Sequence, residues 1–335
     1  MTTLTDLPFQ ILELIASNLS EFTIKSFSLV SKKCRAVSEP EIFRTIKITY
    51  SEFDFNMLEE LSKSPLAAYV KILHYDVSEL FDPVIQDWDY FTSCVYTPQE
   101  YAKDYTDFCW NLRGNGFAYK AIYTYFQRLI ADQQAIMEER KDIHAFMESL
   151  PRLIDLKCIK LSFTGEHENQ LLWFSNRLFV DSWHSFAVHF EAVLRGMISA
   201  KWNGLTIQSL EIHGMPFRSA HESSNILEIA EQGLALVRNF KLVNSPGLLD
   251  LMSAVTLPCL QRFEITDCWL LGSKLIRFLE AHDGIVQHVE FYRINLFYER
   301  FTPGTRSSSC ARTFWELVTE TGNTVKVESL VITPI

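Results

Sequence analysis

The amino-acid sequence predicts an α/β protein with two parts. A small all-helical unit, residues 1–45, precedes an irregular solenoid of parallel strands with helices on its convex side, residues 46–335. Apolar residues at helical spacing predict the first part. A strand pattern that returns along the chain, with helical stretches between its copies, predicts the second. A chain of 335 residues also exceeds the roughly 250–300 at which one compact core stops growing, which favours stacked repeats or several domains.

The overall composition limits which kinds of partner the protein can bind and in which compartment it is expected. A hydrophobic content of 47% with 21% charged residues is typical of a folded chain. The net charge of -10 argues against nucleic acid or an anionic membrane as partner. No run of about 18 apolar residues predicts a membrane span, and the first residues do not resemble a signal peptide. The seven cysteines form no C-x-x-C pair. We therefore expect reduced thiols in the cytoplasm and/or nucleus, with no metal and no cofactor.

The first 45 residues predict three short helices. Pro8 suits the first turn of a helix, where its missing N–H would have no partner anyway. Apolar residues then follow at helical spacing, and a second helix is expected over about 21–28. Ser31 is a plausible N-cap for the third, which Pro40 interrupts. So short a unit rarely stands alone without metal, disulfide or partner, so its leftover apolar face must pack on this chain or on another protein.

The same residues carry a family resemblance. Leu7-Pro8-x-x-Ile11-Leu12-x-x-Ile15, Leu19, the run 29–35 and the run 40–44 resemble the F-box, in the version common in fungal proteins. The resemblance implies docking on the adaptor Skp1, which links F-box proteins to a cullin-RING ubiquitin ligase, while the rest of the chain selects a protein substrate. It also implies which residues face Skp1 or support that face: Leu7, Pro8, Ile11, Leu12, Ile15, Leu19, Val30 and Cys34.

Two positions depart from the F-box pattern. Gln10 stands where the family often has Glu, and Cys34 stands where many members have Trp or Phe. A smaller side chain at position 34 removes apolar contact area at about 25 cal/mol per Å². We therefore expect this departure to lower the affinity for Skp1.

The remainder of the chain repeats a six-residue pattern, apolar-x-x-apolar-x-apolar. Its copies begin at Val70, Leu153, Ile207, Val237, Leu260, Val286 and Val327. The last three residues of each copy alternate like a strand, and helical stretches lie between later copies. The shorter steps between copies are close to the leucine-rich-repeat period of about 20–29 residues. The region resembles the irregular leucine-rich repeats found behind F-boxes, although the signature Asn is missing after most copies. A generic α/β domain with the same alternation is the alternative.

In such a solenoid the polar positions within each strand pattern face the concave side of the sheet. We expect a protein substrate to contact them. They are Asp155, Lys157, Ser209, Glu211, Asn239, Lys241, Arg262, Glu264, His288, Glu290 and Ser329.

A long insertion separates the first two copies of the pattern. Residues 76–116 are acidic and aromatic, and residues 117–149 predict one long helix. We interpret the aromatic residues as local packing rather than as a ligand cage. The carboxylates form either a solvated surface or a dock for a basic partner.

The sequence lacks the common catalytic motifs. It contains no Walker loop, no G-x-S-x-G elbow and no H-E-x-x-H motif, so we expect no enzyme activity. The leading hypothesis is a substrate-recognition subunit of a Skp1–cullin–F-box ubiquitin ligase. The alternatives are an F-box scaffold that acts outside a ligase and an enzyme with an unfamiliar catalytic α/β domain.

Overall fold

The structure is a computed structural model. It describes Leu4 and residues 7–109, 118–163, 182–215, 224–298, 324–327 and 330–334. It confirms the predicted mixed α/β class, with helices at the N-terminus followed by a parallel sheet. No helix in these ranges is both long enough and apolar enough to cross a bilayer.

Three short helices form the N-terminal helical unit, residues 7–44: α1 (Phe9–Ser17), α2 (Glu21–Ser28) and α3 (Lys32–Ile42). The side chains of Ser20 and Ser31 cap α2 and α3 by accepting hydrogen bonds from backbone N–H groups three residues on. Pro40 lies near the end of α3 and does not interrupt it. The unit has a small core of its own, made by Leu12, Ala16, Ile24, Phe27, Cys34 and Val37.

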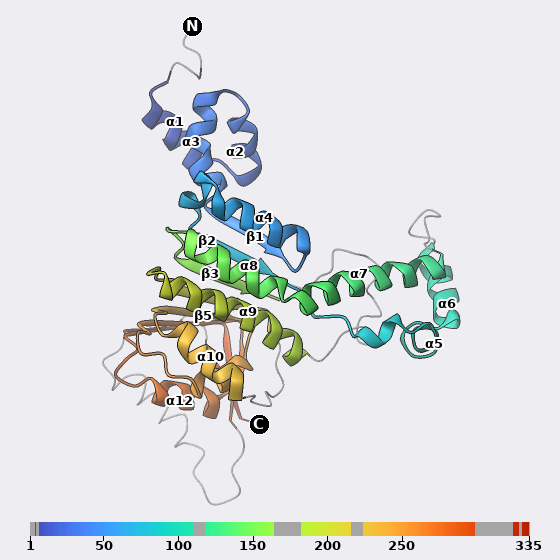
Figure 1. Ribbon diagram of the computed structural model, residues 1–335. Coiled ribbons are helices and arrows are strands. Elements are labelled where there is room, and N and C mark those ends of the chain that lie inside the picture. Colours follow the sequence, from blue (N-terminus) through green and yellow to red (C-terminus); the bar gives the residue numbers. More distant parts are fainter. Residues whose placement is uncertain are drawn as a thin grey trace, which may run out of the picture.

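A parallel sheet of eight strands follows (Figure 1). Its strands lie side by side in the order in which they occur along the chain. Its strands are β1 (Thr45–Thr49), β2 (Ile72–Asp76), β3 (Cys158–Ser162), β4 (Ser209–His213), β5 (Asn239–Val243), β6 (Arg262–Thr266), β8 (His288–Tyr292) and β10 (Thr324–Val327). A second parallel sheet has the order β11-β9-β7, built from β7 (Trp269–Leu271), β9 (Ile294–Tyr298) and β11 (Leu330–Pro334). A parallel strand needs a crossover to return the chain, and helices lie in each of the crossovers from β1 to β8.

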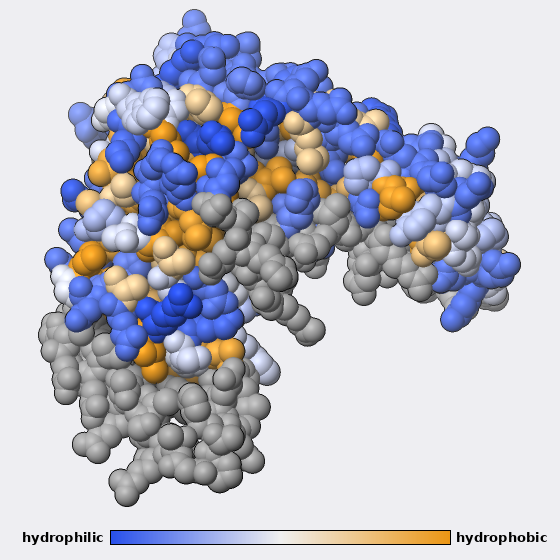
Figure 2. Space-filling view, turned by 60° about the horizontal axis from the view of Figure 1, so that its bottom comes forward, coloured by the Kyte–Doolittle hydropathy of each residue, from blue (hydrophilic) through white to orange (hydrophobic). Residues whose placement is uncertain are grey.

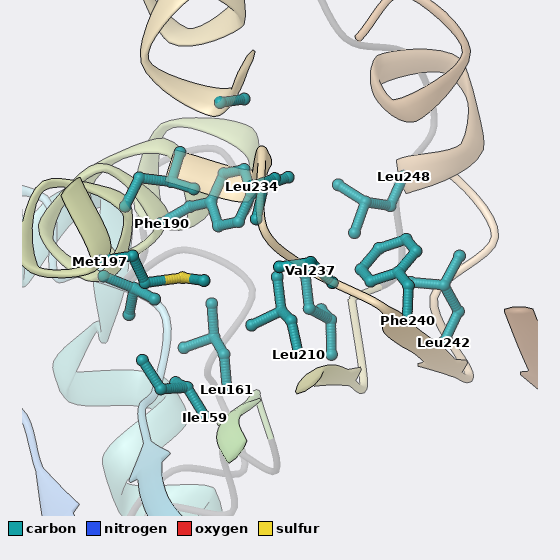
Figure 3. Packing of buried hydrophobic residues seen from close by; sticks show 14 of the residues in the cluster. Ile159, Leu161, Phe190, Met197, Leu210, Leu234, Val237, Phe240, Leu242 and Leu248 are labelled. Carbon is teal, nitrogen blue, oxygen red and sulfur yellow. The ribbon is translucent and has the colours of Figure 1, made fainter. Parts of the chain in front are cut away.

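Helices stack along one face of the large sheet (Figure 1). They are α4 (Glu52–Lys63), α8 (Lys141–Ser149), α9 (Ser182–Trp202), α10 (Ser224–Leu234), α11 (Leu248–Ser253) and α12 (Gly272–Ala281), with 3-10 turns η2 (Pro65–Tyr69) and η5 (Leu150–Arg152) before β2 and β3. The second and fourth residues of β1 to β6 and of β8 point toward these helices. Figure 3 shows Ile159, Leu161 and Leu210 facing Phe190 and Met197 of α9. The first, third and fifth residues of each strand therefore face away from the helices.

One predicted copy of the strand pattern is displaced. Residues 153–161 fit the pattern twice, starting at Leu153 or at Leu156. The structure uses the second start, because Cys158, and not Asp155, pairs in register with Ile72. Asp155 consequently lies in the turn before β3, and Lys157 directly precedes the strand. The last predicted copy is also displaced, since β10 ends at Val327 and β11 begins at Leu330; Ser329 lies outside the described residues.

The residue after each of four successive strands has a left-handed backbone. These residues are Gly214, Asn244, Asp267 and Arg293, with φ angles of 71°, 49°, 55° and 53°. The same backbone bond recurs there: the Gly214 N–H donates to Val243 O, the Asn244 N–H to Thr266 O and the Asp267 N–H to Tyr292 O, each at 2.9 Å. The chain therefore leaves β4, β5 and β6 by the same turn, and Arg293 gives the exit of β8 the same left-handed backbone.

Two small buried side chains connect these turns. Ser245 Oγ accepts from the Met215 N–H at 3.0 Å and donates to Val243 O at 2.9 Å. Cys268 is buried at the corresponding position after β6. Burial raises the pKa of its thiol to about 11, partly offset by the backbone of Ser245 and Asn244.

An arm, residues 77–139, projects away from the sheet (Figures 1 and 2). It contains η3 (Pro83–Gln86), α5 (Trp88–Tyr90), the π-helical turn η4 (Phe91–Val95), α6 (Pro98–Cys109) and α7 (Tyr119–Glu139). The arm has a separate aromatic core, consistent with local packing: Phe81, Ile85, Phe91, Val95, Tyr96, Ile122, Tyr123, Phe126 and Ile130. The single helix predicted over 117–149 is wrong. Arg140, at φ 50°, ends α7 and begins α8, so α7 belongs to the arm and α8 to the helices of the sheet.

A buried histidine lies where the arm joins the sheet. His189 Nδ1 lies 3.1 Å from Tyr75 Oη, and Nε2 lies 3.3 Å from Ser78 O. The rings of Tyr50 and Phe163 pack against the imidazole. Burial lowers the pKa of His189 from 6.5 to about 3, so the folded protein holds it neutral.

We expect Ser245→Ala to lower the free energy of unfolding by about 1–3 kcal/mol, because it leaves the buried Met215 N–H without its acceptor. Ser253→Ala is the matched control, since Ser253 Oγ donates only to Asp250 O within its own helix. Its expected effect is below about 0.5 kcal/mol. Chemical denaturation followed by circular dichroism measures both; equal midpoints for the two variants would contradict this role of Ser245.

Acid should destabilise the fold through His189. Between pH 6.5 and about 3 the unfolded chain binds a proton at this position that the folded chain does not. The free energy of unfolding therefore falls as pH drops through this window, by up to about 1.4 kcal/mol per pH unit. We expect His189→Gln to reduce the slope of stability against pH between 7 and 5. An unchanged slope in this variant would contradict the role of His189.

Candidate interaction surfaces

Helix α1 leaves part of its apolar side uncovered. Pro8 and Leu14 are exposed, and Ile11 is 44% exposed. Positions 8, 11 and 15 are spaced to share one side of a helix, and Ile15 is half-buried at the border of the unit's core. A second side of α1, with Leu12 and Ala16, carries the core contacts.

Helix α2 and the turn after it expose more apolar area. Phe22 is 84% exposed, Leu29 is 75% exposed, and Val30 is exposed beside it. Positions 22 and 29 are seven residues apart and thus lie on one side of the helical path, opposite the buried Ile24 and Phe27. We call the exposed set the α1–α2 surface: Pro8, Ile11, Leu14, Phe22, Leu29 and Val30.

The residues predicted to form the Skp1 face fall into three groups. Pro8, Ile11 and Val30 belong to the α1–α2 surface. Leu7, Ile15 and Leu19 are half-buried at its border. Leu12 and Cys34 are fully buried in the unit's own core, so they support the surface from beneath. The small side chain at position 34 therefore belongs to this core. Its expected effect on the affinity for Skp1 stays a prediction.

Sequence reasoning missed Phe22 and Leu29 as surface residues. The available signal was spacing: Phe22 lies two residues from Ile24, so the two side chains point in different directions on a helix.

The helical unit is joined directly to the sheet. Helix α3 leads into β1, and Arg44 O accepts the N–H groups of Lys71 and Ile72 at 2.9 and 3.0 Å. Lys33 Nζ donates to Leu7 O, which fastens the start of the unit to α3. Although the unit is attached in this way, the sheet and its helices leave the α1–α2 surface exposed.

Ion pairs between neighbouring strands cross the sheet face that points away from the helices. Lys241 Nζ lies 2.5 Å from Glu264 Oε1, and an Arg262 guanidinium nitrogen lies 2.8 Å from Glu290 Oε1. At the other end of the sheet Lys47 pairs with Asp76 at 2.7 Å. Lys241 and Glu264 are direct partners in the strand register. Lys47 and Arg262 reach carboxylates two residues beyond their register partners on the adjacent strand.

Hydrogen bonds connect most of the remaining polar positions of this face. Asn239 Nδ2 donates to Ser209 Oγ at 3.0 Å. His213 Nε2 lies 3.2 Å from Glu211 Oε2, and this contact holds the pKa of Glu211 below its ordinary value. His74 Nε2 lies 2.9 Å from Ser162 Oγ, and burial lowers the pKa of His74. The face thus presents ordered polar groups of both charge signs.

Most of the predicted substrate positions lie together on this face. They form two rows across β4–β8: Ser209, Asn239, Arg262 and His288 in one, and Glu211, Lys241, Glu264 and Glu290 in the other. Asp155 and Lys157 are not on the strand, because the pattern is displaced by three residues. The structure instead places Lys160 in the second row, between His74 and Glu211. The second fit of the pattern, starting at Leu156, was the signal that would have identified it.

The described residues give neither surface the ligands of a metal centre. No group of three or more His, Cys, Asp or Glu side chains in the described ranges is arranged to hold a metal ion. Cys34, Cys94, Cys158, Cys259 and Cys268 are free thiols. The α1–α2 surface offers apolar contacts, and the sheet face offers polar contacts.

Comparison with known protein families agrees with this division. Residues 4–45 match the F-box domain. No curated protein matches the chain. The F-box domain supports a role in Skp1 binding, as an adaptor of SCF-type ubiquitin ligases.

Proposed function

We propose that this protein is the substrate-recognition subunit of a Skp1–cullin–F-box ubiquitin ligase. Its α1–α2 surface binds a Skp1-like adaptor, and its sheet face binds a protein substrate. The observation that carries the proposal is the exposure of large apolar side chains within the matched residues 4–45. In this proposal the chain binds and positions other proteins in the cytoplasm and/or nucleus, and it has no catalytic centre of its own.

The energetics of the α1–α2 surface favour a stable complex. Each large apolar side chain that passes from water to a buried site contributes about 1.5–3 kcal/mol. Phe22, Leu29 and Ile11 together supply enough to offset much of the association cost, about 4–15 kcal/mol. Exposed aromatic and aliphatic side chains clustered in this way mark a protein-interaction site. The resemblance of the residues to the version of the F-box common in fungi adds to this interpretation.

We also propose that the sheet and its helices form a leucine-rich-repeat solenoid. Leu260-x-x-Phe263-x-Ile265-x-x-Cys268 fits the repeat signature, with Cys at its Asn position. Ser245 occupies the same position one turn earlier and bonds the backbone of the neighbouring turn. The identical exits from β4, β5 and β6 support the same interpretation. In this interpretation Ser245 and Cys268 take the place of the signature Asn.

The substrate in this proposal is a protein bound through polar contacts. The sheet face carries both charge signs in fixed positions, as in the pairs Lys241–Glu264 and Arg262–Glu290. Such complementary charges give specificity more than affinity. The acidic balance of the chain disfavours nucleic acid.

Binding to a purified Skp1-like adaptor tests the first step. We expect Ile11→Asp and Leu29→Asp each to weaken binding at least about 30-fold in calorimetry, because each would bury an unpaired carboxylate in an apolar interface. Their midpoints of chemical denaturation should stay close to that of the unchanged protein, since both positions are exposed. Phe53→Asp is the control: Phe53 is 76% exposed on α4, outside the helical unit, and its change should leave binding intact.

Two outcomes would count against the proposal. Undiminished Skp1 binding by both variants would remove the α1–α2 surface from the interface. Affinity purification of the intact chain that recovers the adaptor without a cullin would favour the alternative, an F-box scaffold acting outside a ligase.

A further inference from the structure

The arm carries a third exposed surface, separate from the α1–α2 surface and from the sheet face. From residue 77 to residue 102 the chain has five carboxylates and no Lys, Arg or His: Glu79, Asp82, Asp87, Asp89 and Glu100. Large aromatic side chains, Trp88 and Tyr90, are exposed in the middle of this segment. The arm therefore combines strong negative charge with exposed aromatic rings.

Trp88 is held in place by its neighbours although it is 41% exposed. Its ring packs edge-on against Tyr123, with centroids 4.7 Å apart, and against Tyr119 at 5.8 Å. Phe91 stacks beside it at 6.3 Å. Tyr123 is itself fixed, because its hydroxyl donates to Gln86 O. A partner would therefore meet an aromatic ring that loses little freedom on binding.

Two carboxylates flank this ring along the chain. Asp87 is the N-cap of α5, where its Oδ1 accepts the Tyr90 N–H at 2.7 Å, and its side chain remains exposed. Asp89 is also exposed, and its carboxylate has no ion-pair partner among the described residues. Successive helical residues are turned by about 100° from each other, so Trp88 and Asp89 point to adjacent sides of α5.

We propose that Trp88, with Asp87 and Asp89, docks a lysine- or arginine-rich segment of a protein partner. An ammonium or guanidinium group lies over the face of Trp88, attracted by the ring, while the two carboxylates neutralise its charge. Charge complementarity selects this occupant: an acidic segment or a nucleic acid would be repelled by five carboxylates with no intervening base. The partner can be the substrate or another protein, and the inference stands whether or not the α1–α2 surface binds Skp1.

A labelled oligolysine peptide of nine residues is the probe, and fluorescence anisotropy with the full chain at moderate salt is the measurement. We expect Asp87→Asn/Asp89→Asn to weaken binding at least about fivefold, since it removes both flanking charges. Asn is also a good N-cap, so this variant keeps the start of α5. The matched control is Glu138→Gln/Glu139→Gln, which removes two exposed charges near the end of α7 and should change the affinity less than twofold.

The aromatic contribution has its own variant. Trp88→Leu should weaken binding about 2- to 30-fold, the range expected for losing one cation–π contact. Circular dichroism and the thermal midpoint show whether each variant is folded. If the leucine variant proves unfolded, the asparagine pair alone decides the outcome.

Three results would overturn the proposal. The first is no measurable binding of the peptide by the unchanged chain. The second is an equal loss in the asparagine pair and the glutamine pair, which would mean that the peptide responds to the total charge of -10. The third is a concentration-dependent dimer, seen by sedimentation, that disappears in Asp87→Asn/Asp89→Asn; this would assign the surface to a second copy of the chain.

Discussion

The N-terminal helices hold more apolar side chains than three short helices can bury. Their core has room for Leu12, Ala16, Ile24, Phe27, Cys34 and Val37, and it leaves Phe22, Leu29 and Ile11 in contact with water. Helices of eight to eleven residues have only one narrow inward side each. The remaining sheet and helices of the chain do not cover the exposed set. Binding of a protein partner would remove this surface from water, and the proposed function depends on that constraint.

The attachment of the helical unit gives this partner a fixed position relative to the sheet. Helix α3 continues into β1, and the backbone of Arg44 bonds the start of β2. The parallel strands then stack without a gap from β1 to β10 (Figure 1). The chain leaves β4, β5 and β6 by the same hydrogen-bonded turn. An adaptor bound to α1 and α2 and a substrate bound to the sheet face would thus be connected by continuous hydrogen-bonded structure, as positioning a substrate for a ligase requires.

The spacing of residues along the sequence predicted much of this structure. Features that depend on contacts between distant residues could not be predicted from it. The three helices and the alternating strands follow from periodicity that is visible within a few residues. The division of α7 from α8 at Arg140 was not visible, because no proline or glycine marks it and the break arises where the arm meets the sheet helices. Residues 153–161 fit the strand pattern twice, and only pairing with β2 selects the register. Ile11 and Leu12 are adjacent apolar residues, and only the packing of α1 on α3 decides which one is exposed. Pairs such as Lys241–Glu264 likewise require the strand register.

Amide hydrogen exchange on the chain, alone and bound to a purified Skp1-like adaptor, tests the central claim most directly. We expect the adaptor to slow amide exchange in peptides covering residues 8–30. The exchange rates of β4, β5 and β6 should stay the same. Slower exchange confined to the sheet strands, with α1 and α2 exchanging as fast as in the free chain, would contradict it.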